Sequence, residues 1–133
     1  MGKQNLTEKL LIKENRKIIF INQPDYFYDE LLLSENIKIH DNISPDMDLI
    51  ILFINNLMEF DGYIPIAVEN IKNDGILWVC YPKKHSPAEK DISRDMIRKK
   101  MFKKGYKQVT QISIDEIWTG IRFRRIELVH KTR

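Results

Sequence analysis

One stretch decides the fold of this chain: Asn73-Asp74-Gly75-Ile76-Leu77-Trp78-Val79-Cys80-Tyr81-Pro82. It reads as a turn, then an uninterrupted apolar run, then a proline that ends a strand. The run is apolar at every position and not at every second one, so other parts of the protein must cover both of its faces. The stretch therefore predicts a central strand in a largely parallel sheet.

On both sides of this strand, strand patterns alternate with helix patterns. Ile18–Ile21 and Leu49–Ile54 are again wholly apolar and predict central strands, whereas Asn36–His40 alternates as an edge strand does. Tyr106–Ile114 and Ile117–Ile126 predict two last strands with no helix between them. Helices are predicted at Asn5–Ile12, at Tyr26–Leu33, at Leu57–Lys72 with a kink or a fresh start near Pro65, and from Asp91 or Ser93 to Lys104.

Strands that alternate with helices imply right-handed crossovers and a doubly wound sheet. We predict a three-layer α/β domain with six mostly parallel strands in the order 2-1-3-4-6-5, of which only the last strand is antiparallel. The length of 133 residues, with 43% hydrophobic and 31% charged residues, fits one globular domain. This domain is expected to span residues 1–133, with an N-terminal helix and turn at 1–16 and a polar tail at 127–133.

Composition argues against several kinds of protein. The single cysteine, Cys80, cannot build a disulfide framework or a cysteine metal site, and we interpret it as a small buried hydrophobe. The three histidines lack the spacing of metal ligands, so no metal is expected. No stretch has the character of a signal peptide or the length of a membrane span, which predicts a cytoplasmic protein without a membrane partner.

Polar residues follow the predicted strands at one edge of the sheet. Open α/β sheets bind ligands outside the carboxyl ends of the strands where the strand order reverses, here between the first and third strands. The candidates for cofactor binding at this point are Asn22, Asp25, Asp41 and Asn55. The expected rim of the site consists of Tyr81, Lys83, Asp91, Arg94, Asp95, Asp115, Glu116, Trp118 and Arg122. Arg94 could form ion pairs with Asp115 or Glu116 across this edge, and no catalytic residue stands out.

The usual cofactor loop is missing from this edge. Nucleotide-binding and S-adenosylmethionine-binding sheets place glycines after the first strand, so that the backbone can approach the ligand. Here no glycine occurs between Gly2 and Gly62, and Pro24 has no N–H to donate. One residue favours a cofactor: Asp41 follows the second strand, where an acidic side chain would hold a ribose. An ordinary loop aspartate is the simpler interpretation of Asp41.

The helix expected to end at Lys104 carries a basic stripe formed by Arg98, Lys99, Lys100, Lys103 and Lys104. Such a stripe could contact phosphates, but a solvated helix face is the simpler interpretation. The sequence shows few aromatic residues interleaved with the stripe, which weakens a model of stacking on single-stranded nucleic acid.

Parts of the chain resemble two known groups of proteins. The C-terminal half of Rossmann-like methyltransferases resembles three parts of this chain: Asp48–Phe53, the turn Ile71–Gly75 with the strand that follows it, and the closing antiparallel pair. In those enzymes the turn commonly reads Leu-Lys-Pro-Gly-Gly, from which this chain departs at Asn73 and Asp74. From Leu11 to Arg124 the chain also resembles a family of small bacterial proteins known only as a domain of unknown function. The residues that carry this second resemblance are Asn22, Pro24, Leu77-Trp78-Val79, Tyr81-Pro82-Lys83, Asp91, Arg94-Asp95, Asp115-Glu116, Trp118 and Arg122-Phe123-Arg124. It implies a shortened Rossmann-like, methyltransferase-like fold and no particular activity.

Three functional hypotheses follow. The first is a non-catalytic module that binds a ligand or partner and, without the glycine-rich loop, needs no cofactor. The second is a methyltransferase that binds S-adenosylmethionine through an atypical loop. The third is a nucleic-acid-associated protein that uses the basic helix 91–104. The sequence favours the first, with a small molecule or a protein as partner over nucleic acid, and with a monomer or homodimer as the assembly.

Overall fold

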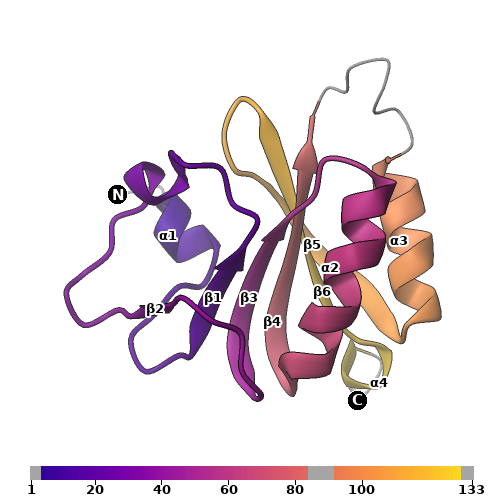
Figure 1. Cartoon of the computed structure of the whole chain (residues 1–133), viewed down its shortest axis with the longest axis horizontal. Helices are drawn as coiled ribbons and strands as arrows, with labels where there is room; N and C mark the ends of the chain where they lie inside the picture. The colour runs from indigo at the N-terminus through magenta and orange to yellow at the C-terminus, as the bar shows by residue number, and fades with distance from the viewer. Residues whose placement is uncertain (1–3, 84–91, 130–133) are drawn as a thin grey trace.

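The computed structural model describes residues 4–83 and 92–129 (Figure 1). Its six strands form one sheet in the order β2-β1-β3-β4-β6-β5. The strands are β1 (Ile18–Ile21), β2 (Ile39–His40), β3 (Met47–Phe53), β4 (Ile71–Pro82), β5 (Tyr106–Ser113) and β6 (Trp118–Arg125). The helices are α1 (Leu6–Lys9), η1 (Phe27–Glu30), α2 (Leu57–Asn70), α3 (Arg94–Lys103) and α4 (Ile126–Val129). β6 is antiparallel to both of its neighbours, so the predicted order and direction of the strands are confirmed.

β4 is the central strand that its apolar run predicts. It lies between β3, to which it is parallel, and β6, and its residues Leu77 to Cys80 have no exposed surface. Leu77 and Val79 face a core that α2 and α3 cover, whereas Trp78 and Cys80 face a core that α1 and the segment around η1 cover. The Trp78 indole N–H donates to the Leu10 carbonyl at 3.0 Å, which fixes the N-terminal segment on the sheet.

The predicted turn at Asn73–Gly75 is wrong, because β4 already begins at Ile71. Met47 pairs with Ile71 and Leu49 with Ile76, so the extra residues of β4 form a bulge in the strand. An ion pair of 2.7 Å between Lys72 and Asp48 connects the bulge to β3. The glycine at position 75 serves a close approach here, since a Cβ on Gly75 would lie 2.5 Å from the Ile71 side chain.

Several predicted elements are shorter or more regular than the sequence suggested. Only Phe27–Glu30 of the helix expected after β1 is helical, as one 3₁₀ turn, and β2 keeps two residues at the sheet edge. α2 continues through Pro65 without a second start. Pro65 removes one bond to the Asp61 carbonyl, and water can replace that bond because both residues are exposed. Of the two proposed caps of α3, Ser93 accepts from the Met96 N–H, while Asp91 lies outside the described residues.

Candidate functional site at the carboxyl edge of the sheet

The carboxyl ends of β1, β3 and β4 and the β5–β6 turn meet at one edge of the sheet, as Figure 1 shows. The strand order reverses between β1 and β3, so the structure places the switch point where the sequence predicted it. Asn22 follows β1 and Asn55 follows β3, and their side chains lie beside each other at this point.

A hydrogen-bond network closes the switch point. The Asn22 Nδ2 donates to the Phe53 carbonyl at 2.9 Å and to the Glu59 Oε1 at 3.1 Å. The same Oε1 accepts from the Asn55 backbone N–H at 2.7 Å and from the Asn55 Nδ2 at 3.1 Å. Asn56 caps α2 by accepting from the Glu59 N–H at 2.9 Å. The polar side chains at the ends of β1 and β3 and at the start of α2 are thus hydrogen-bonded to one another.

In the loop after β1, one residue has a positive φ angle, the conformation that glycine adopts most readily. Asn22 has φ 61°, in the left-handed region that asparagine tolerates better than most residues and glycine adopts freely. Beyond it, the Phe27 N–H donates to the Pro24 carbonyl at 3.0 Å to start η1. A single 3₁₀ turn does not offer the row of free N–H groups that a long helix presents to an anionic group.

Tyr28 and Asp41 are both exposed at the carboxyl edge, beside the switch point. Tyr28 is 41% exposed, and its ring packs against Phe20 of β1 with the ring centroids 5.3 Å apart. Partial burial raises the pKa of the Tyr28 phenol, and the charge of Asp41 raises it further. Asp41 directly follows β2 and is exposed, as is Asp25. An aromatic ring and a carboxylate are therefore accessible together at this edge.

A second polar cluster joins the segment around η1 to the β5–β6 turn. The Trp118 indole N–H donates to the Tyr26 hydroxyl at 3.0 Å, and the Asp115 Oδ1 accepts from the backbone N–H groups of Ile117 and Trp118, both at 2.8 Å. Glu30 lies against Asp115. Its partial burial, a hydrogen bond shared with Asp115 and the charge of Asp115 raise the pKa of Glu30 to about 7. The surroundings of Glu30 therefore favour its protonated form.

Lys83 after β4 and Arg94 of α3 both donate hydrogen bonds to side chains of β5. The Lys83 Nζ donates to the Ser113 Oγ at 2.6 Å, and the Arg94 Nη1 donates to the Gln111 Oε1 at 3.4 Å. Arg94 thus contacts Gln111 and forms neither of the ion pairs with Asp115 or Glu116 that the sequence suggested. Asp95 forms a loose ion pair with Arg98 at 3.5 Å. Burial raises the pKa of Tyr81, which lies close to the charges of Arg94 and Asp95.

Comparison with known proteins identifies the scaffold. The chain is similar to the crystal structure of ribosomal protein L11 methylase from Lactobacillus delbrueckii subsp. bulgaricus, with a TM-score of 0.59 and 10% sequence identity. The match covers 90% of this chain and 74% of the methylase chain. The fold is that of the Rossmann-like methyltransferases. At this identity, the match establishes the architecture and leaves the activity to be tested.

Weaker likenesses extend to two further structures. LepI in complex with SAM matches with a TM-score of 0.48 and 12% identity, over 90% of this chain and 39% of LepI. M. jannaschii TYW2 in complex with AdoMet matches with a TM-score of 0.42 and 14% identity, over 95% of this chain and 78% of TYW2. No protein-family model and no curated protein matches the chain. The match to the L11 methylase confirms the methyltransferase-like fold, and the absence of a matching family model leaves the resemblance to the bacterial family of unknown function unsupported.

Two of the predicted rim residues take no part in the polar clusters at the carboxyl edge of the sheet. Glu116 is exposed in the β5–β6 turn, and Arg122 lies in the middle of β6, opposite Trp78 of β4. Burial lowers the pKa of Arg122, and the nearby charges of Arg124 and Arg16 lower it further. Arg122 thus belongs to a group of guanidinium side chains on the sheet face, and not to the carboxyl edge.

The sequence did not identify the side chains that join separate elements to one another at the carboxyl edge of the sheet. Glu59 has a local signal, because Asn56 followed by Glu59 is the spacing of a helix cap, but its bonds to Asn22 and Asn55 depend on the packing of α2. Tyr26, Tyr28 and Glu30 were assigned to a helix, and their partners Trp118, Asp41 and Asp115 come from other parts of the chain. No local pattern pairs such distant residues.

Metal ligands and membrane spans have no candidates in the described part of the chain. Among residues 4–83 and 92–129, no group of His, Cys, Asp and Glu side chains could hold a metal ion. Within the same residues, no helix has the length and apolar character to cross a membrane.

Proposed function

We propose that the protein binds S-adenosylmethionine at the carboxyl edge of its sheet and acts as a methyltransferase with an atypical cofactor loop. The observation that carries the proposal is the exposure of the Tyr28 ring and the Asp41 carboxylate at one edge of a sheet similar to that of a methylase. This proposal replaces the sequence-based preference for a module that needs no cofactor.

The residues at the edge fit the adenosyl half of such a cofactor. The Asp41 carboxylate can accept hydrogen bonds from the two ribose hydroxyls, and the exposed part of the Tyr28 ring can stack on adenine. Asn22 provides the left-handed backbone that a loop glycine would otherwise supply after β1. When bound, the cofactor would supply an electrophilic methyl group. The chain's own part would be to hold the adenosyl group beside Asn22 and Asp25.

Isothermal titration with S-adenosylmethionine and S-adenosylhomocysteine tests this proposal. We expect dissociation constants in the micromolar range, about −8 kcal/mol. Asp41→Ala should weaken binding by about 10- to 100-fold, since hydrogen bonds to a charged group contribute about 1.5–3 kcal/mol. Asp74→Ala is the matched control, because Asp74 is an exposed aspartate in the bulge at the amino end of β4. An Asp41→Ala protein that binds as tightly as the parent would contradict the assignment.

A second candidate function is a non-catalytic ligand- or partner-binding module. The Asn22–Glu59–Asn55 network favours it, because these side chains satisfy one another at the point where a cofactor would approach. This candidate predicts no heat of binding and no thermal shift with either adenosyl compound. A micromolar affinity for S-adenosylmethionine would exclude it in this form.

A further inference from the structure

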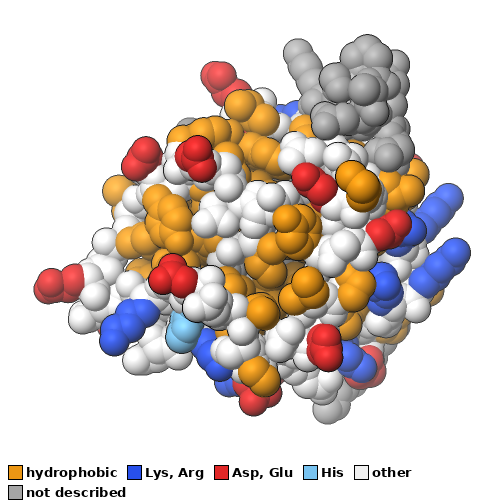
Figure 2. Space-filling view, in the orientation of Figure 1, with side chains coloured by type: hydrophobic (Ala, Val, Ile, Leu, Met, Phe, Trp, Pro, Cys, Tyr) orange, Lys and Arg blue, Asp and Glu red, His pale blue; other side chains and the backbone are white. Residues whose placement is uncertain are grey.

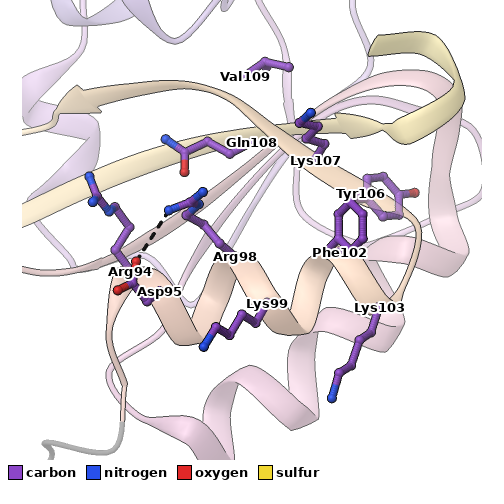
Figure 3. Close-up of a pocket in the computed structure, with 10 residues that line it drawn as sticks. All are labelled: Arg94, Asp95, Arg98, Lys99, Phe102, Lys103, Tyr106, Lys107, Gln108 and Val109. Atoms are coloured by element: carbon purple, nitrogen blue, oxygen red, sulfur yellow. Dashed lines mark hydrogen bonds and ion pairs between the residues drawn. The ribbon is translucent and has the colours of Figure 1, made fainter. Parts of the chain in front are cut away.

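A separate groove lies between α3 and the edge strand β5 (Figure 3). It has a volume of about 750 Å³ and is distinct from the switch point between β1 and β3. Arg94, Arg98, Lys99, Phe102, Lys103 and Lys107 line it. In Figure 3, Arg94 and Arg98 extend from α3 towards β5, where Gln108 lies.

The helix places an aromatic ring among the cations. Arg94, Arg98 and Phe102 are spaced four residues apart and therefore share one side of α3. Lys99 precedes Phe102 by three residues, which places it beside the ring on the helix surface. Phe102 is 54% exposed, whereas Ile97 and Met101 on the inner face of α3 are fully buried. The ring is thus available to a partner and is not needed for the core.

The charge of the groove is almost entirely positive. Five cationic side chains line it against one carboxylate, Asp95. Asp95 contacts Arg98 at 3.5 Å, and both side chains are largely exposed, so this pair neutralises little of the field. Figure 2 shows Lys and Arg side chains gathered over α3 at the side of the molecule. A binding partner that complements this surface must carry several negative charges.

We propose that this groove binds single-stranded nucleic acid, with Arg98, Lys99 and Lys103 on phosphates and Phe102 stacked on a base. Proteins that bind single strands without sequence preference combine cationic side chains along the nucleic-acid backbone with aromatic rings that stack on the bases. The groove offers both features. An acidic peptide that adds a strand to β5 fits less well. The register of β5 shifts between Gln108 and Thr110, and such a bulge interrupts the edge that a peptide would have to pair with.

The exposed ring reverses the sequence-based preference against nucleic acid, which depended on the shortage of aromatic residues near the stripe. Binding in this groove is also independent of the proposed methyltransferase function, since no adenosyl cofactor takes part in it. If S-adenosylmethionine does not bind, the proposal of nucleic-acid binding in the groove still stands. If nucleic acid does not bind, the proposal of a cofactor site at Tyr28 and Asp41 still stands.

Fluorescence anisotropy with labelled single-stranded RNA and DNA of roughly 12 nucleotides, a length within the usual site sizes, tests the proposal. We expect log affinity to fall linearly with log salt. Lys99→Gln with Lys103→Gln should reduce the slope by about 1.4, because each phosphate contact on a single strand contributes about 0.7. Phe102→Ala should weaken binding roughly 5- to 100-fold and leave the slope unchanged. The RNA and DNA series show which backbone is preferred.

The matched control is Lys13→Gln with Lys38→Gln, which removes two exposed lysines near the opposite edge of the sheet. It should bind like the parent protein. Thermal melts establish that every variant is folded. The proposal is overturned if the parent binds neither oligonucleotide, or if Phe102→Ala binds as well as the parent. It is also overturned if poly-glutamate competes as effectively as the oligonucleotide, which would instead favour an acidic protein partner.

Discussion

The switch point between β1 and β3 and the groove between α3 and β5 are both polar, but their polar groups are satisfied differently. At the switch point, Glu59 accepts from Asn22 and Asn55, so the protein pairs its own groups. In the groove, five cationic side chains and one carboxylate line the surface, so the region carries an excess of positive charge that a partner can complement. The first region is therefore held together by its network, and a partner has more to gain by binding the second.

The largest effect is expected from a buried residue of the central strand β4. Trp78 has no exposed surface and holds the N-terminal segment through the Leu10 carbonyl. Trp78→Ala should lower the free energy of unfolding by about 3–5 kcal/mol, measured by urea denaturation. Trp78→Phe keeps most of the volume and should cost less. A urea midpoint near that of the parent for Trp78→Ala would contradict the central position of β4.

A smaller effect is expected from breaking the network itself. Glu59→Ala leaves the donors of Asn22 and Asn55 without their shared acceptor, which should cost about 1–3 kcal/mol of unfolding free energy. Glu69→Ala, an exposed glutamate on the same helix, is the control and should change stability by less than about 0.5 kcal/mol. Equal effects of the two substitutions would show that the switch point is not held by Glu59.

The smallest effect concerns pH. The pKa of Glu30 is raised from 4.5 to about 7, so the folded protein binds this proton more tightly than the unfolded chain does. The resulting stabilisation is complete below pH 4.5 and is lost as the pH rises through about 7. The melting temperature should therefore fall between about pH 5 and pH 8, and Glu30→Gln should reduce this fall. An unchanged pH profile in Glu30→Gln would show that protonation of Glu30 does not affect folding.

The fold was predictable because it depends on hydrophobic patterning. The apolar runs at Ile18–Ile21, Leu49–Ile54 and Ile76–Tyr81 identify three central strands, and the missing helix after β5 requires an antiparallel partner. The bulge in β4 was not predictable, because Asn73-Asp74-Gly75 is a strong local turn signal. Here, pairing of Ile71 with Met47 overrides that signal.

The candidate site was predictable only in part. Topology correctly brought Asn22 and Asn55 together, since the carboxyl ends of parallel strands share one edge. The Tyr28–Asp41 pair and the contact of Glu30 with Asp115 depend on the irregular segment around η1, which no periodic pattern describes. The exposure of Phe102 likewise became visible only once Ile97 and Met101 were seen to form the inner face of α3.

The most direct test of a cofactor site at the carboxyl edge is a ¹H–¹⁵N correlation spectrum of the protein titrated with S-adenosylhomocysteine. Binding at this edge predicts saturable shifts of the backbone amides of Asn22, Tyr28 and Asp41, with those of Arg98 and Phe102 unchanged. Shifts confined to α3 and β5, or no shifts at millimolar ligand, which is about −4 kcal/mol of binding free energy, would contradict a cofactor site there.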